Sequence, residues 1–210
     1  MKKLFAILLS CALLVGMTAV LADGAAVPTW AELLDYDPTG VANVGTAGTP
    51  MSLLPMLERS VAVKQRIVEE DPTEQGIRKA LNLGHTIGHA FESLFMRDQA
   101  PDPKHQARKP ILHGYAVAYG LVCELYLSVV KAGFPVEKMR QTVRYIHEHY
   151  GRLPITCDDY PALTELMTHD KKNVAGRINF TLLGDIGDIR INQTATLQEI
   201  EEALDFYREG

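Results

Sequence analysis

The chain has 210 residues, of which 47% are hydrophobic and 22% are charged, and these proportions are ordinary for a soluble globular protein. A chain of this length can bury the core of one good-sized domain. The formal net charge of −5 argues against a general nucleic-acid-binding protein, because such a protein needs a basic excess to displace counterions from phosphates. The three cysteines are scattered and form neither a disulfide framework nor a CxxC pattern, which is typical of a reducing compartment.

The first residues form a segment unlike the rest of the chain. Lys2 and Lys3 precede an apolar run from Leu4 to Ala22 that ends in small residues. This order of basic, apolar and small residues is typical of an export signal. The alternatives are a buried first helix, or a start that does not belong to the domain behind it. We therefore assign residues 1–28 to a signal-like or non-family leader and residues 29–210 to one domain.

Behind the leader, the sequence predicts a mainly helical domain. Residues 24–50 read mostly as loop, because glycine, proline and threonine are frequent there. Helical apolar spacing covers the ranges 53–70, 76–96, 114–131, 136–150, 160–169 and about 196–208. Residues 178–182 and 189–191 alternate with a period of two around a glycine-containing turn, which predicts a hairpin. The expected fold is a helical bundle-like domain with one small β-hairpin.

The range 76–96 carries the most informative pattern. As one helix, it would place five polar residues on one narrow face: Arg78, Asn82, His85, His89 and Glu92. A solvated helix face usually carries Glu, Lys and Gln instead, so this face predicts a functional site. Gly84 and Gly88 each cost a helix about 1 kcal/mol relative to alanine. They therefore predict that some other group approaches the backbone closely at this point.

Histidines are the candidate metal ligands. His85 and His89 are spaced to bind one divalent ion, but no glutamate stands between them, so they do not form the HExxH motif of metalloproteases. The other interpretation places one of these histidines on a metal and the other on a substrate. His113 precedes the nearly uncharged range 114–131 and is either a further ligand or a capping residue. Imidazoles of this kind suit Zn²⁺ or a similar ion.

Lysines supply candidate anion-binding groups. Lys64 lies in the apolar stripe of the range 53–70, between Val61 and Val68. A lysine in such a position either extends its ammonium group into solvent or points it into a cleft to bind an anion. Lys171 and Lys172 follow the range 160–169 and offer the same charge. Together with the histidines, these residues predict metal-assisted chemistry on a small, oxygen-rich anion.

Several of these segments resemble 3-dehydroquinate synthase, an enzyme of the shikimate pathway. The resemblance is carried by RKALNLGHTIGHA from Arg78, by LHGYAVAYG from Leu112, by the range 59–71 and by DKK from Asp170. It covers about residues 30–208. It implies that His85 and His113 bind the metal, Zn²⁺ or Co²⁺, and that His89 and Lys171 are catalytic. The substrate contacts that it implies come from Lys64, Arg78, Asn82, His89 and Lys171.

The resemblance also implies a reaction and its partners. A seven-carbon phosphorylated keto acid would lose phosphate and close into 3-dehydroquinate, with NAD as a recycled redox group and the metal polarising substrate oxygens. The family holds most of the NAD in an N-terminal α/β domain, for which the sequence leaves no room, so we expect a separate α/β domain or chain as partner. The family is cytoplasmic, whereas the leader raises export as an alternative. The resemblance leaves a homodimer open.

Departures from the family pattern keep other functions open. The family's third metal ligand is a glutamate with a substrate lysine three residues later; if Gly16-Met17 marks that segment, these positions fall on Ala19 and Ala22. Two imidazoles alone leave a catalytic zinc site one protein ligand short. The family's HGE also ends in Tyr115 here. The chain is thus either part of a lyase, a non-catalytic or exported remnant, or the domain of a metal-dependent polyol dehydrogenase, although its lysines and arginine favour a phosphorylated acid.

Overall fold

The computed structural model describes residues 53–97, 108–168 and 178–210. The predicted leader over residues 1–28, the domain boundary at residue 29, and both Lys171 and Lys172 lie outside these ranges. The division into a leader and one domain therefore stays a prediction.

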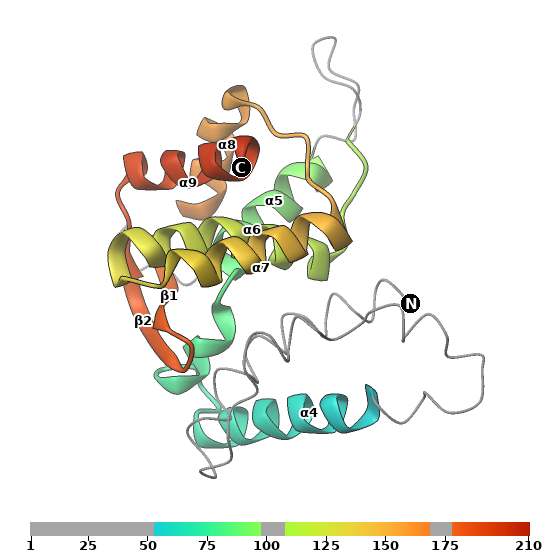
Figure 1. The fold of residues 1–210 in the computed structure, drawn as a ribbon, viewed down its shortest axis with the longest axis vertical. Helices are drawn as coiled ribbons and strands as arrows, with labels where there is room; N and C mark the ends of the chain where they lie inside the picture. The colour runs from blue at the N-terminus through green and yellow to red at the C-terminus, as the bar shows by residue number, and fades with distance from the viewer. Residues whose placement is uncertain (1–52, 98–107, 169–177) are drawn as a thin grey trace, which may run out of the picture.

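Helices form most of the described structure (Figure 1), as the sequence predicts. They are α4 (Leu53–Glu70), η2 (Ile77–Asn82), α5 (His85–Arg97), α6 (His113–Leu127), η3 (Ser128–Ala132), α7 (Val136–Tyr150), η4 (Cys157–Asp159), α8 (Tyr160–Thr168) and α9 (Leu197–Glu209). Two antiparallel strands, β1 (Asn179–Asp185) and β2 (Asp188–Thr194), form the hairpin. The predicted fold class, mainly helical with one small hairpin, is confirmed.

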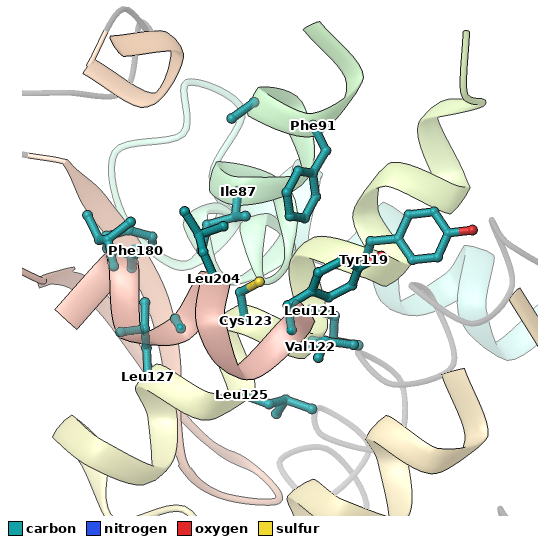
Figure 2. Close-up of a cluster of buried hydrophobic side chains, with 14 of the residues drawn as sticks. Ile87, Phe91, Tyr119, Leu121, Val122, Cys123, Leu125, Leu127, Phe180 and Leu204 are labelled. Carbon is teal, nitrogen blue, oxygen red and sulfur yellow. The ribbon is translucent and has the colours of Figure 1, made fainter. Parts of the chain in front are cut away.

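The core is built around α6. This helix is buried on almost all sides, as its lack of charge predicts, and it packs against α5, α7, α9 and β1. Side chains from four elements meet there (Figure 2), including Phe91 of α5, Val122 of α6, Phe180 of β1 and Leu204 of α9. Burying one such side chain contributes about 1.5–3 kcal/mol. The stretch His113–Ala132 is long and apolar enough to span a membrane, but its burial is that of a core helix.

The hairpin holds the N-terminal elements of the site against this core. The hydroxyl of Thr181 in β1 donates to the carbonyl of Lys79 in η2 at 2.8 Å, and the hydroxyl of Thr86 in α5 donates to the carbonyl of Asn179 in β1 at 3.0 Å. The β1 strand thereby contacts both η2 and α5.

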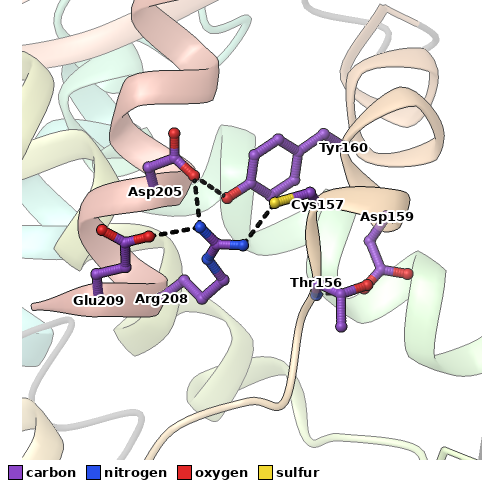
Figure 3. A network of polar contacts seen from close by, with 7 residues as sticks. All are labelled: Thr156, Cys157, Asp159, Tyr160, Asp205, Arg208 and Glu209. Atoms are coloured by element: carbon purple, nitrogen blue, oxygen red, sulfur yellow. Dashed lines mark hydrogen bonds and ion pairs between the residues drawn. The ribbon is translucent and has the colours of Figure 1, made fainter.

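Polar contacts join the last two helices (Figure 3). One carboxylate oxygen of Asp205 in α9 accepts from the hydroxyl of Tyr160 in α8 at 2.6 Å and from Arg208 at 3.2 Å. Burial, together with this hydrogen bond, raises the pKa of Tyr160. The bond between Tyr160 and Asp205 ties α9 to α8, and α9 in turn packs against α6.

The single helix predicted over residues 76–96 is wrong. The structure contains two pieces: the 3₁₀-helix η2 ends at Asn82, and α5 begins at His85. Between them Leu83 is extended (ψ 128°) and Gly84 adopts a left-handed conformation (φ 79°), which glycine accepts readily. The five polar residues therefore do not share one helix face.

The apolar stripe predicted around Lys64 is also wrong. Lys64 is exposed, and the neighbouring Val61 is 62% exposed. From residue 60 to the end of α4, where the side chains are described, the buried positions are instead Ser60 and Ile67, seven residues apart, which is the spacing of one helix face. A charged ammonium group remains solvated by lying away from that face. Helix α4 ends at Glu70, directly before Asp71-Pro72, as predicted.

Candidate metal centre

Three imidazole rings meet where α5 and α6 begin. The ring centroids of His85 and His89 are 5.5 Å apart, those of His85 and His113 are 5.4 Å apart, and those of His89 and His113 are 5.5 Å apart. His85 and His89 are half-buried on successive turns of α5, whereas the side chain of His113 is 50% exposed. The structure therefore brings together the two predicted metal ligands and the predicted catalytic histidine.

A carboxylate that the sequence analysis placed on the predicted polar face, without giving it a role, lies beside these rings. Oε2 of Glu92 is 3.1 Å from Nδ1 of His113. Ligand atoms of His89, Glu92 and His113 all lie within 4.8 Å of one another. The spacing did contain a signal for Glu92, because it follows His89 by three residues and so lies on the same face of α5.

The first residue of α5 is oriented by the chain that precedes it. Nδ1 of His85 lies 3.1 Å from the carbonyl oxygen of Leu83. A carbonyl oxygen only accepts, so this contact places the ring proton on Nδ1 and the lone pair of a neutral ring on Nε2. The extended conformation of Leu83 thus fixes which nitrogen of His85 can bind a metal ion.

A buried carboxylate defines the start of α5. Glu124 of α6 is fully buried, and its oxygens accept from the backbone N–H groups of Gly84 at 2.6 Å and Ile87 at 3.2 Å. The first N–H groups of a helix lack partners within the helix, and a negative charge is favourable there. Glu124 satisfies this end from another helix. In the sequence, Glu124 is the one acid of the nearly uncharged range 114–131.

Glycines let α5 and α6 approach closely, as the sequence predicts for Gly84 and Gly88. A methyl group at Gly120 of α6 would lie 2.3 Å from the Gly84 carbonyl oxygen and 2.4 Å from the Gly88 nitrogen. At Gly88 it would lie 2.9 Å from the carbonyl oxygen of Ala116. The group that approaches the backbone of α5 is therefore α6, and this contact brings His113 to the α5 histidines.

Two predicted substrate residues lie on η2 and contact the preceding loop. Arg78 donates from Nη1 to the carbonyl of Pro72 at 2.8 Å, and Asn82 donates from Nδ2 to Oε1 of Glu74 at 2.5 Å. The carboxylate of Asp71 organises this loop by accepting three backbone N–H groups, those of residues 75, 76 and 78. The Gln75 bond is the main reason that the pKa of Asp71 lies below its ordinary value.

The donor atoms at the cluster suit a divalent transition metal. Imidazole nitrogens with a carboxylate oxygen are typical ligands of Zn²⁺ and Co²⁺, and Zn²⁺ binds them at about 2.0–2.2 Å in a tetrahedral arrangement. The three rings come from two helices whose spacing is set by their backbones. In their chemistry, the imidazole and carboxylate groups gathered here fit the ion that the sequence predicts.

Comparisons with known proteins show which family the chain resembles. The sequence model of the 3-dehydroquinate synthase C-terminal domain matches residues 27–173. The 3-dehydroquinate synthase of Parabacteroides distasonis is 61% identical over 156 residues, which cover 74% of this chain and 41% of that protein. The enzyme of Colwellia psychrerythraea is 34% identical over 161 residues, which cover 75% and 42%. The chain thus spans about two-fifths of the length of the curated relatives that it matches.

Two solved structures share the fold. ValA, the 2-epi-5-epi-valiolone synthase of Streptomyces hygroscopicus subsp. jinggangensis 5008 with NAD⁺ and Zn²⁺ bound, superposes with a TM-score of 0.65 at 20% identity, over 96% of this chain and 50% of that one. A 2-deoxy-scyllo-inosose synthase with carbaglucose-6-phosphate, NAD⁺ and Co²⁺ gives 0.62 at 20% identity, over 95% and 50%. The fold likeness and the close relatives lead to one conclusion: the chain belongs to the 3-dehydroquinate synthase family and matches its C-terminal domain.

Proposed function

We propose that this chain is the metal- and substrate-binding part of a 3-dehydroquinate synthase-type carbon–oxygen lyase. The observation that carries the proposal is the meeting of three imidazoles within 5.5 Å of one another at the start of α5 and α6. We assign the metal, Zn²⁺ or Co²⁺, to His85 and His113. The Nδ1 proton of His85, which is held by the Leu83 carbonyl, leaves Nε2 as its ligand atom.

The substrate of this activity is a seven-carbon phosphorylated keto acid. A bound metal would polarise its oxygens. Lys64, Arg78, Asn82 and Lys171 would bind its phosphate, carboxylate and hydroxyls, because cationic side chains and amides recognise such groups. The backbone of Arg78 is anchored by Asp71, which supports a positioning of its guanidinium. His89 and Lys171 are assigned to proton transfer at the reacting carbon and oxygen atoms.

NAD and a further protein part complete the proposal. The two fold neighbours contain NAD⁺, and this chain covers half of each. We infer that NAD is held mainly by an α/β domain or chain beyond the described residues. A cytoplasmic location and a homodimer, both implied by the resemblance, belong to the same proposal.

A metal-binding measurement tests the assignment of the two ligands. Zn²⁺ content and Co²⁺ binding are compared in the full chain, in a His85→Ala, His113→Ala double variant, and in a control, His149→Ala, at an exposed residue of α7. The double variant should lose the bound metal, while the control should bind as the unaltered chain does. Full zinc content in the double variant would show the assignment to be wrong.

A complementation assay tests the reaction itself. The chain is mixed with the α/β half of the Parabacteroides distasonis enzyme, NAD and the phosphorylated keto acid, and phosphate release is measured. Release that requires both parts supports the lyase. A folded, metal-loaded mixture without release would favour the non-catalytic remnant. Binding of a neutral polyol in preference to the phosphorylated acid would favour the polyol dehydrogenase.

A further inference from the structure

We propose that Glu92 is a positioning residue of the metal centre: its carboxylate holds the His113 imidazole in the tautomer that has its proton on Nδ1 and its lone pair on Nε2. This inference rests on the proposed role of His113 as a metal ligand. It gives a role at the site to a residue that does not itself touch the metal or the substrate.

The contact between the two side chains determines where the ring proton lies. Oε2 of Glu92 and Nδ1 of His113 are 3.1 Å apart. An ionised carboxylate accepts hydrogen bonds and donates none. The proton shared in this contact therefore belongs to Nδ1, and a neutral His113 ring presents its lone pair at Nε2, the opposite nitrogen.

The His113 ring contacts the rings of His85 and His89, but half of its side chain is exposed, so a hydrogen-bond partner helps to fix its orientation. His113 is the first residue of α6, and half of its side chain is exposed, compared with a quarter of the Glu92 side chain. An exposed side chain samples several rotamers, and ordering it costs entropy when a ligand binds. Glu92 lies one turn beyond His89 on α5, and α5 packs closely against α6 at Gly84, Gly88 and Gly120. Its carboxylate is therefore held near the start of α6, where His113 lies.

The same arrangement occurs at the other proposed ligand. His85 donates its Nδ1 proton to the carbonyl oxygen of Leu83, and His113 donates its own to Glu92. Metal-binding histidines usually donate their second ring N–H to a carbonyl or a carboxylate, which fixes the ring and increases its basicity. In both rings that the proposed function assigns to the metal, Nδ1 carries the proton and Nε2 carries the lone pair of the neutral ring.

Direct binding of the metal by Glu92 is the competing arrangement, because ligand atoms of His89, Glu92 and His113 lie within 4.8 Å of one another. The two arrangements respond differently to Glu92→Gln. The glutamine amide oxygen still accepts the Nδ1 proton, so a positioning role is largely kept. A neutral amide is a poorer ligand than a carboxylate, so a direct ligand would be lost.

The experiment uses the full chain with Glu92→Gln, Glu92→Ala and a control, Glu201→Gln, which makes the same chemical change at an exposed residue of α9. Imidazole ¹⁵N spectra of the metal-free proteins in alkaline buffer report the tautomer of His113. Titration with Co²⁺ reports affinity, and the visible absorption bands of the bound ion report its ligand set. Backbone NMR spectra show whether each variant is folded.

We expect an Nδ1-protonated His113 in the unaltered chain, in the control and in Glu92→Gln, and loss of this preference in Glu92→Ala. Co²⁺ affinity should fall about 10–100-fold in Glu92→Ala and by less in Glu92→Gln, with unchanged absorption bands. Two results overturn the proposal: an unchanged tautomer in folded Glu92→Ala, or absorption bands that change in both variants. If the unaltered chain binds no metal, the proposed function is wrong. The role of Glu92 is still tested in that case, because the His113 tautomer is measured in the metal-free protein.

Discussion

Oε2 of Glu124 in α6 accepts a hydrogen bond of 2.6 Å from the backbone N–H of Gly84, so a fully buried carboxylate of one helix caps the N-terminus of its neighbour. The second oxygen accepts from Ile87 at 3.2 Å. His85 lies between these two positions. The orientation of the first metal-ligand candidate therefore depends on a side chain 39 residues further along the chain.

Replacement of Glu124 should destabilise the protein and loosen this start of α5. Glu124→Ala leaves two buried N–H groups without an acceptor, at a cost of about 1–3 kcal/mol each. Glu124→Gln keeps one acceptor oxygen and should cost less. Urea unfolding of both variants measures the free energies. Equal stability of Glu124→Ala and the unaltered chain would contradict the capping role.

Gly120→Ala should be among the most disruptive single-methyl changes in the part of the chain that the structure describes. The added carbon would meet backbone atoms of Gly84 and Gly88 within 2.4 Å, and backbone cannot rotate away as a side chain does. Overpacking of this kind costs about 1–3 kcal/mol, and we expect the upper end of that range. The control is Ala118→Gly at another buried position of α6, which measures how much a change between alanine and glycine alters the stability of the helix itself. Gly133→Ala is unsuitable as a control because Gly133 has a positive φ.

Unfolding of Gly120→Ala and Co²⁺ binding are measured together. Separation of α5 from α6 should weaken Co²⁺ binding, because His113 moves with α6. A variant that is as stable as the unaltered chain and binds Co²⁺ equally well would show that the close approach is not needed.

The sequence predicted the helices and hairpin well, because their signals are local. The periodicity of α7, the capping box of Thr196 and Glu199 in α9, and the turn at Gly187 each depend on a few neighbouring residues. The break at Gly84 was missed because the group that stabilises it, Glu124, is distant in the chain.

The site was predicted in part for the same reason. His85 and His89 are joined by helical spacing, which is visible in the sequence. The approach of His113 needed the resemblance to a known family. Glu92 was placed on the polar face but received no role, because its partner lies on another helix. The apolar stripe predicted around Lys64 was wrong because two apolar neighbours in the sequence did not reveal which face of α4 is buried.

The ion pair between Arg108 and Asp159 should contribute to stability chiefly through the cost of breaking it. Nη2 of Arg108 lies 2.7 and 2.8 Å from the two carboxylate oxygens, and the side chains are only 6% and 8% exposed. The guanidinium also lies over the ring of Phe95, 5.1 Å from its centroid. Removal of one partner from such a pair leaves a buried charge uncompensated, at a cost of about 3–5 kcal/mol.

Arg108→Met should therefore lower the free energy of unfolding by about that amount, as measured by urea titration. The double variant Arg108→Met, Asp159→Asn should recover part of the loss, because the amide carries no charge and its oxygen still accepts from the backbone N–H of Thr156. If the double variant is less stable than Arg108→Met, the uncompensated charge is not the cause.

His147 should make the stability of the fold fall as the solution becomes acidic. Nε2 of His147 is buried and has no hydrogen-bond partner among the residues that the structure describes, and the ring lies edge-on to Tyr207 with centroids 6.1 Å apart. Burial, and then the positive charge of Arg152, lowers the pKa of His147 from 6.5 to about 4. Between these two values the unfolded chain binds the proton and the folded chain does not. Stability from this group is therefore complete above about pH 6.5 and is lost progressively toward pH 4.

Urea unfolding at several pH values in this window should give a shallower pH slope for His147→Gln, because glutamine does not titrate. An identical slope in the variant would assign the acid sensitivity to other groups, and an NMR titration of His147 in the folded protein would then have to give an ordinary midpoint.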